Sequence, residues 1–282
     1  MTVLVGMNFY RAAGDPGRRQ ERAIRALRAL PDVCVVNLQW RDEPFEVDGI
    51  PTRAVLQANS RTISGREGRR KPIISEMFDA LAVAAAEHGC RYFIYANSDI
   101  EITPQAISLI DGSARDGFAF VRTDLDPETG VPLGPMRFGV DAFAFSVAWW
   151  GLHRHRFRAY IAGEPAWDNV YLAVLLTHSN GELIDQQGMV LHQRHDSPWM
   201  KSPFDDYTWY LAALDRPYFA LWARFHADWV RLVETPAVES AMRALRGRIF
   251  TIDELRRGRV VQWGRALKAR VRYAVQQHRR RS

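Results

Sequence analysis

Lysine and cysteine are scarce in this sequence of 282 residues. Lysine occurs only at Lys71, Lys201 and Lys268, so arginine supplies nearly all of the positive charge. The two cysteines, Cys34 and Cys90, are too few for a disulfide framework and form no C-x-x-C pair. No apolar run approaches the roughly 18 residues that a membrane-spanning helix needs. These absences exclude a disulfide-stapled scaffold and a C-x-x-C metal or redox site, and no transmembrane helix is predicted.

The first residues also lack the basic segment that precedes the apolar core of a signal peptide. We therefore expect Val3–Met7 to be a first buried strand and the protein to be cytoplasmic. Hydrophobic residues make up 47% of the chain and charged residues 25%, which is ordinary for a globular protein. The length suits one large α/β domain, or such a domain with an appendage.

Positive charge is concentrated near the end of the sequence. Residues 243–282 contain 13 basic and 2 acidic side chains, whereas the other 242 residues contain 25 basic and 30 acidic ones. An apolar stripe at helical spacing runs through this basic segment: Val260, Trp263, Leu267, Val271 and Ala274. We expect a catalytic domain over residues 1–235 and a basic helical extension over 236–282. The stripe fits either docking on the protein's own domain or peripheral contact with an anionic membrane. Nucleic acid is not an expected partner, because no basic-aromatic module is present.

The pattern of strands and helices predicts an α/β fold. Val3–Met7 is followed by a helical pattern over Arg18–Leu30 and a second strand over Val33–Gln39, which is a β-α-β opening that favours parallel pairing. Residues 42–70 have weak periodicity, with a short helix expected at Arg53–Asn59. Further helices are expected at Pro72–Glu87, Pro104–Asp111, Ala166–Ser179 and from Tyr207 onward. Further strands are expected at Arg91–Ala96, Gly117–Arg122, Phe138–Ser146, Glu182–Asp185 and Met189–His192. Together these elements predict a mostly parallel central sheet flanked by helices.

A polar tip follows the third predicted strand, where Tyr92–Ala96 runs into Asn97-Ser98-Asp99. Ligands of α/β folds bind at the carboxyl ends of such strands. A carboxylate fixed there is suited to holding Mg²⁺ or Mn²⁺ against the oxygens of a diphosphate. An Asp that caps the helix beginning near Thr103-Pro104 is the alternative interpretation.

Other chemically capable groups occur in order along the chain. Lys71 stands at a helix start, Asp141 lies in the predicted strand Phe138–Ser146, and Asp168 enters a helix directly after Trp167. His192 and His195 follow the last short strand. Each has a structural alternative: a solvated charge for Lys71, a helix N-terminal charge for Asp168, and a hydrogen-bonded structural role for the histidines.

In the order of these strands and motifs, the sequence from Val3 to Trp199 resembles a GT-A fold glycosyltransferase, a nucleotide-diphospho-sugar transferase of the family 2-like kind. That family ends a central strand with a D-x-D motif whose last Asp holds a divalent metal bridging the donor diphosphate. The resemblance implies that Asp99 is this ligand, with Mn²⁺ or Mg²⁺ as cofactor. Asn97 departs from the motif, since an amide can hydrogen-bond ribose or metal-bound water but brings no charge.

The resemblance also implies roles for the remaining candidates. Asp168 would be the catalytic base for an inverting transfer, and one of His192 and His195 would complete the metal site or touch the diphosphate. The other members of the implied donor-binding set are the base and ribose contacts Asn8 and Tyr10, the phosphate contact Lys71, and Asp141 for sugar hydroxyls.

We therefore expect a glycosyltransferase that moves a sugar from a UDP-sugar or GDP-sugar donor to a hydroxyl acceptor, which is a saccharide, a lipid-linked compound or another hydroxyl compound. Two alternatives remain open. One is a non-catalytic sugar-nucleotide or partner-binding protein on the same fold. The other is a metal-dependent phosphoester hydrolase built on Asp99, His192 and His195, which would need more bridging carboxylates than the sequence offers.

Overall fold

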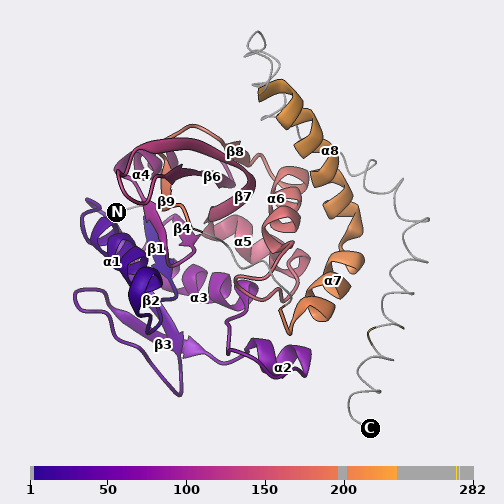
Figure 1. The fold of residues 1–282 in the computed structure, drawn as a ribbon, viewed down its shortest axis with the longest axis horizontal. Coiled ribbons are helices and arrows are strands. Elements are labelled where there is room, and N and C mark those ends of the chain that lie inside the picture. Colours follow the sequence, from indigo (N-terminus) through magenta and orange to yellow (C-terminus); the bar gives the residue numbers. More distant parts are fainter. Residues whose placement is uncertain (1–2, 196–201, 234–270, 272, 274–282) are drawn as a thin grey trace. The chain divides into compact units, whose positions relative to one another are not determined.

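A computed structural model of the protein describes residues 3–195, 202–233, 271 and 273 (Figure 1). The chain divides into two compact units, each assembled from three segments of the sequence. The first unit comprises Met1–Gln57, Ser75–His155 and Gly181–Pro198. The second comprises Ala58–Ile74, Arg156–Asn180 and Trp199–Ser282.

The first unit is built around a nine-stranded mixed sheet. Its strands are β1 (Val3–Met7), β2 (Cys34–Trp40), β3 (Thr52–Leu56), β4 (Tyr92–Ala96), β5 (Ile100–Ile102), β6 (Gly117–Leu125), β7 (Pro132–Ser146), β8 (Glu182–Ile184) and β9 (Val190–Gln193). They pair in the order β3-β2-β1-β4-β7-β6-β9-β5, with β8 paired to β6. Pairs involving β7 or β5 are antiparallel, and all the others are parallel. The expected α/β fold with a mostly parallel sheet is confirmed and is consistent with a GT-A-like architecture.

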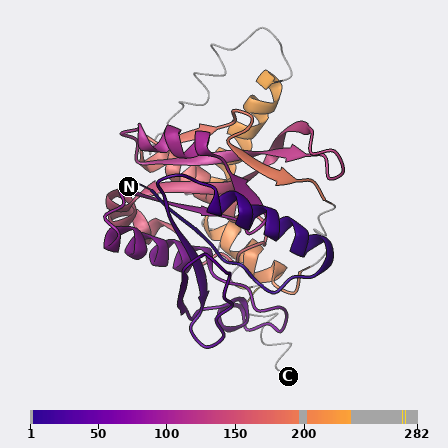
Figure 2. The same cartoon turned by 90° about the vertical axis from the view of Figure 1, so that its left-hand side faces the viewer.

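Four helices accompany this sheet: α1 (Gly14–Arg28), α3 (Ile74–Glu87), α4 (Pro104–Asp111) and α5 (Val147–His153), the last continuing into the 3-10 helix η1 (Arg154–Arg156). Side chains along a strand alternate between its two faces, so each strand of the sheet contributes to two cores. One core joins alternate residues of β1 and β4 to apolar side chains of α1 and α4. Figure 2 shows α1 lying along the sheet.

The opposite face of the sheet is covered by α3 and α5. The ring of Phe78 on α3 lies 5.9 Å from that of Phe93 and 5.2 Å from that of Trp150 on α5, measured between centroids. On β1 this face carries Gly6, where an added Cβ would lie 2.0 Å from Cδ2 of Leu81. The close approach of α3 to β1 therefore depends on the missing side chain.

The second unit contains α2 (Ser60–Ser64), α6 (Trp167–His178), α7 (Asp205–Leu214) and α8 (Arg216–Val233). A buried carboxylate supports it, because Asp215 Oδ1 accepts from Nε of the half-exposed Arg158 at 2.7 Å and Oδ2 accepts from the Tyr160 hydroxyl at 3.1 Å. Burial outweighs both contacts and raises the pKa of Asp215. The hydroxyl of Tyr273 donates to the carbonyl of Ser64 at 2.9 Å. The expected boundary at residues 235 and 236, and most of the apolar stripe beyond it, lie outside the described residues.

The structure differs from the sequence-based predictions at three places. The helix expected at Arg53–Asn59 is wrong: Thr52–Leu56 is the edge strand β3, paired in parallel with β2, and α2 follows it. The strand expected at Phe138–Ser146 begins earlier, at Pro132, because it forms a long antiparallel hairpin with β6. The short elements β5 and α5 were not predicted. Among the residues that the structure describes, every helix is too short or too polar to cross a bilayer.

Candidate metal and donor site

Strand pairing brings Asp99 and His192 together although 93 positions separate them in sequence. After β4 the chain makes a tight turn in which the amide of Ile100 donates to the carbonyl of Asn97 at 3.0 Å. Ile100, the first residue of β5, is then paired with His192 of β9 in antiparallel register. Asp99, one residue before Ile100, is thereby held next to His192.

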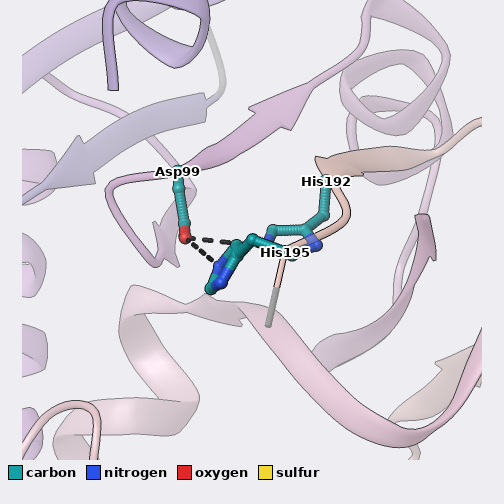
Figure 3. Close-up of side chains that lie close together, drawn as sticks. All are labelled: Asp99, His192 and His195. Carbon is teal, nitrogen blue, oxygen red and sulfur yellow. Dashed lines mark ion pairs between the residues drawn. The ribbon is translucent and has the colours of Figure 1, made fainter. Parts of the chain in front are cut away.

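Asp99, His192 and His195 converge on one point (Figure 3). The Nε2 atoms of His192 and His195 lie 3.6 Å and 3.5 Å from Oδ2 of Asp99, and one potential ligand atom from each residue lies within 4.8 Å of the others. Asp99 and His195 are partly exposed, with 29% and 26% of their side-chain surface accessible, whereas His192 is only 2% accessible. The site is therefore open to solvent at Asp99 and His195, whereas His192 is buried.

The three residues fit a divalent metal. Two donor atoms that each lie about 2.1 Å from one cation are about 3.0 Å apart at an octahedral angle and about 3.4 Å apart at a tetrahedral one, and the imidazole nitrogens lie slightly farther than this from the carboxylate oxygen. Those distances are long for direct hydrogen bonds. One carboxylate with two imidazoles suits Mn²⁺ better than Mg²⁺, which prefers oxygen ligands.

The electrostatic balance of the site favours the ionised form of its carboxylate. Burial opposes ionisation of Asp99, but the rings of His192 and His195 outweigh burial and hold the pKa of that carboxyl well below its usual range. Burial likewise opposes the charged form of His192, yet Asp124 and Asp99 raise its pKa. The carboxyl group of Asp99 is therefore ionised over the whole physiological pH range, and its oxygens are suited to binding a cation.

Two of the other predicted donor contacts, Asn97 and Asp141, are bonded to each other. Nδ2 of Asn97 donates to Oδ1 of Asp141 at 2.9 Å, and the side-chain oxygen Oδ1 of Asn97 accepts from the hydroxyl of Tyr95 at 3.1 Å. The second oxygen of Asp141 accepts from Nη1 of Arg122 at 3.0 Å. Nε of Arg122 donates to Asp124. The amide at position 97 is thus one end of a polar network beside the candidate metal site.

Sequence reasoning missed Arg122 and Asp124. The predicted strand ended at Arg122, but β6 continues to Leu125, and Asp124 is paired in parallel register with His192 of β9. A signal was present, because the polar residues Arg122 and Asp124 alternate with Val121, Thr123 and Leu125. Such alternation marks two side chains on the same face of a strand.

The predicted base and ribose contacts lie at the carboxyl ends of β1 and β2. Nδ2 of Asn8 donates to the carbonyl of Leu38 at 2.6 Å, and the backbone of Tyr10 is held by both amide atoms of Gln20. Tyr10 lines a hollow of about 370 Å³ together with residues of α1 and of the segment after β2, among them Phe45. Asn8 itself is not among the residues that line it.

Lys71 and Asp168 belong to the second unit. The ammonium of Lys71 lies 2.6 Å from a carboxylate oxygen of Glu164, whose side chain is 1% accessible and which also accepts from the hydroxyl of Ser202 at 2.8 Å. Asp168 stands in the first turn of α6. The residue before that helix, Ala166, has a φ of 76°, an unusual conformation for a residue with a side chain.

No protein-family model matches the chain, and no curated protein matches it. Among solved structures, S. aureus TarS residues 1–349 is similar over 76% of this chain and 65% of that chain, with 14% identity and a TM-score of 0.44. A second S. aureus TarS structure is similar over 76% of this chain and 39% of its own, with 13% identity and a TM-score of 0.44. The chain thus spans less than two thirds of these structures.

The galactosyltransferase LgtC in complex with donor and acceptor sugar analogues is similar over 79% of this chain and 96% of that one, with 13% identity and a TM-score of 0.33. Similarity at this level does not identify a reaction. The chemistry of this chain has to be inferred from its own residues.

Proposed function

We propose that this protein is a glycosyltransferase that transfers a sugar from a nucleoside-diphosphate donor to a hydroxyl acceptor, with a divalent metal bound at Asp99, His192 and His195. The observation that carries the proposal is the convergence of these three side chains where the chain leaves β4. That is the edge at which α/β sheets bind their ligands. The donor is a UDP-sugar or GDP-sugar, and the acceptor a saccharide, a lipid-linked or another hydroxyl compound.

When bound, a divalent metal supplies positive charge to the diphosphate of the departing nucleotide. Mn²⁺ is the better match for the mixed imidazole and carboxylate donors, with Mg²⁺ as the alternative. Asp99 would contribute the anionic ligand, and the two histidines would contribute neutral nitrogen ligands. Asn97 and Asp141, held together beside the metal site, would present the remaining polar atoms of their network to the ribose or the sugar hydroxyls.

The hollow next to Tyr10 and Phe45 offers aromatic surface at the ends of β1 and β2 for the base and ribose of the donor. Asn8, which does not line the hollow, would contact the base or ribose through its side-chain oxygen, since its amide nitrogen donates to the carbonyl of Leu38. Lys71 would reach the diphosphate only by sharing or leaving its ion pair with Glu164.

Asp168 is proposed as the base that accepts the proton of the acceptor hydroxyl while the sugar carbon is attacked, which inverts its configuration. An Asp168→Asn variant should lose transfer activity by at least about 100-fold. It should retain nucleotide and metal binding, because the amide keeps the size of the side chain. Normal turnover by this variant would mean that Asp168 is not the base and would favour a retaining mechanism.

The first experiment is a thermal-shift series with UDP, GDP, CDP and dTDP, each with and without Mn²⁺. A ligand at about 100 times its dissociation constant should stabilise the protein by about 2.7 kcal/mol. A shift that is selective for one base and requires the metal supports the transferase and identifies the donor base. The matched control is His195→Gln, which should lose the metal-dependent part of the shift.

Two other outcomes would favour the alternatives. Nucleotide binding without transfer to any acceptor would favour a non-catalytic binding protein. No shift with any nucleotide, combined with metal-dependent hydrolysis of simple phosphoesters, would favour a hydrolase. The described residues offer one group of metal ligands rather than the pair expected for a two-metal hydrolase.

A further inference from the structure

Asp124 lies directly behind the candidate metal site. Its Oδ1 is 2.9 Å from Nδ1 of His192, on the side of the imidazole ring that faces away from Asp99. The pairing of β6 with β9 fixes this contact, since Asp124 and His192 are register partners. Both side chains are shielded from water, with 13% and 2% of their surface accessible.

A carboxylate in this position determines which ring nitrogen can bind a metal. An ionised carboxylate only accepts hydrogen bonds, so the nitrogen that faces it must carry the proton. In the neutral ring the other nitrogen then keeps its lone pair. For His192 this nitrogen is Nε2, the atom that lies 3.6 Å from Oδ2 of Asp99.

Asp124 is itself held in place. Arg122, two residues earlier on the same face of β6, donates from Nε to Oδ1 of Asp124 at 2.9 Å. The same guanidinium donates from Nη1 to Asp141 at 3.0 Å. With the arginine anchored by two carboxylates, the oxygen that faces His192 has little freedom to rotate.

We propose that Asp124 is a positioning residue that holds His192 in the Nδ1–H tautomer with Nε2 directed at the metal, and so raises the affinity of the site for divalent cations. The proposal deepens, and rests on, the proposed metal-dependent function. Outer-shell carboxylates of this kind commonly contribute 10- to 100-fold to metal affinity. Asp124 needs no contact with donor or acceptor for this role.

The test compares Mn²⁺ binding to the full-length wild type, Asp124→Ala and Asp124→Asn, with free Mn²⁺ quantified by electron paramagnetic resonance and no nucleotide present. We expect binding about 10- to 100-fold weaker for Asp124→Ala. The loss should be smaller for Asp124→Asn, whose amide oxygen can still accept from Nδ1. Glu128→Gln is the matched control, because it removes one negative charge from an exposed position of the same β6–β7 hairpin and should bind as the wild type does.

A second readout reports the ring directly. Long-range ¹H–¹⁵N spectra of metal-free protein with labelled histidine, recorded at alkaline pH where the ring is neutral, distinguish the two tautomers. His192 should be Nδ1–H in the wild type and shift toward Nε2–H in Asp124→Ala. If Asp124→Ala does not fold, Asp124→Asn provides both readouts, with an intermediate affinity as the supporting result.

Wild-type affinity in the Asp124 variants would overturn the inference and leave the proposed metal site intact. An affinity loss equal to that of Glu128→Gln would overturn it too, because charge alone would then explain the effect. If the wild type binds no Mn²⁺, the metal site of the proposed function is wrong and the inference falls with it. The two failures are therefore distinguishable.

Discussion

An Asn97→Asp substitution would restore the acidic first position of a D-x-D motif, and its effect can be worked out from the structure. The amide of Asn97 donates to Oδ1 of Asp141 at 2.9 Å. Aspartate at position 97 would replace this donor with a second acceptor. The carboxylates at positions 97 and 141 would then lie at hydrogen-bond distance from each other. The guanidinium of Arg122 binds Asp141 on the side away from position 97.

Two responses to this conflict have very different costs. Two ionised carboxylates about 3 Å apart repel each other by about 6 kcal/mol at an effective dielectric constant of about 20. Protonating one of them costs about 4 kcal/mol at pH 7, because an ordinary aspartate pKa is about 3.9 and each pH unit is worth about 1.4 kcal/mol. Protonation is cheaper, and the protonated group can again donate to Asp141. We expect the free energy of unfolding to fall by about 2–4 kcal/mol at pH 7.

The pH dependence provides the sharper test. The new carboxyl would have a folded-state pKa raised above its unfolded value, so the protonated form is favoured in the folded protein. The resulting loss in the free energy of unfolding is small near the unfolded-state pKa and grows as the pH rises toward the folded-state pKa. The destabilisation by Asn97→Asp should therefore be markedly larger at pH 7 than at about pH 5.

Urea unfolding of metal-free protein in EDTA at the two pH values measures this difference. The matched control, Asn97→Ala, loses the hydrogen bond without adding charge, and should cost about 1–3 kcal/mol at both pH values. The reasoning is refuted if Asn97→Asp is as stable as the wild type at pH 7, or if its penalty does not change with pH. Tighter Mn²⁺ binding by a fully stable variant would instead mean that position 97 faces the metal.

Three further predictions concern single sites. Gly6→Ala should lower the free energy of unfolding by about 1–3 kcal/mol, because its methyl group would collide with Leu81; unchanged urea unfolding would contradict this packing. Ala166→Gly should be neutral or stabilising by up to about 1 kcal/mol, since glycine adopts a positive φ without steric strain; a loss above about 1 kcal/mol would contradict it. In EDTA, His192 should stabilise the folded state through its pKa, which the neighbouring carboxylates raise against the opposing effect of burial. This contribution is fully present below the ordinary histidine pKa of about 6.5 and is lost as the pH rises. Unfolding free energies between about pH 6 and 8.5 should accordingly decline less in His192→Gln than in the wild type, and equal declines would contradict the assignment.

The sequence by itself determined those parts of the protein that depend on local pattern. The opening Val3–Met7 strand, the helix after it and the Tyr92–Ala96 strand with its polar tip were all predictable, because apolar periodicity and punctuation by Pro and Gly act over a few residues. The candidates Asp99, His192 and His195 were predictable as chemical types at strand ends. Their meeting at one metal was implied only by the family resemblance, because the local pattern of the chain does not show which strand ends lie together.

Tertiary structure decided the rest. That both histidines reach Asp99 follows from the antiparallel pairing of β5 with β9, and β5 is too short to have a periodic signal. That Asp124 stands behind His192 follows from the parallel pairing of β6 with β9 across 68 positions of sequence. Strand register is set by the whole sheet and its cores, whereas periodicity along one strand shows only which side chains share a face. The sequence therefore identified which groups can bind a metal, and the sheet decided which of them meet and which residue orients them.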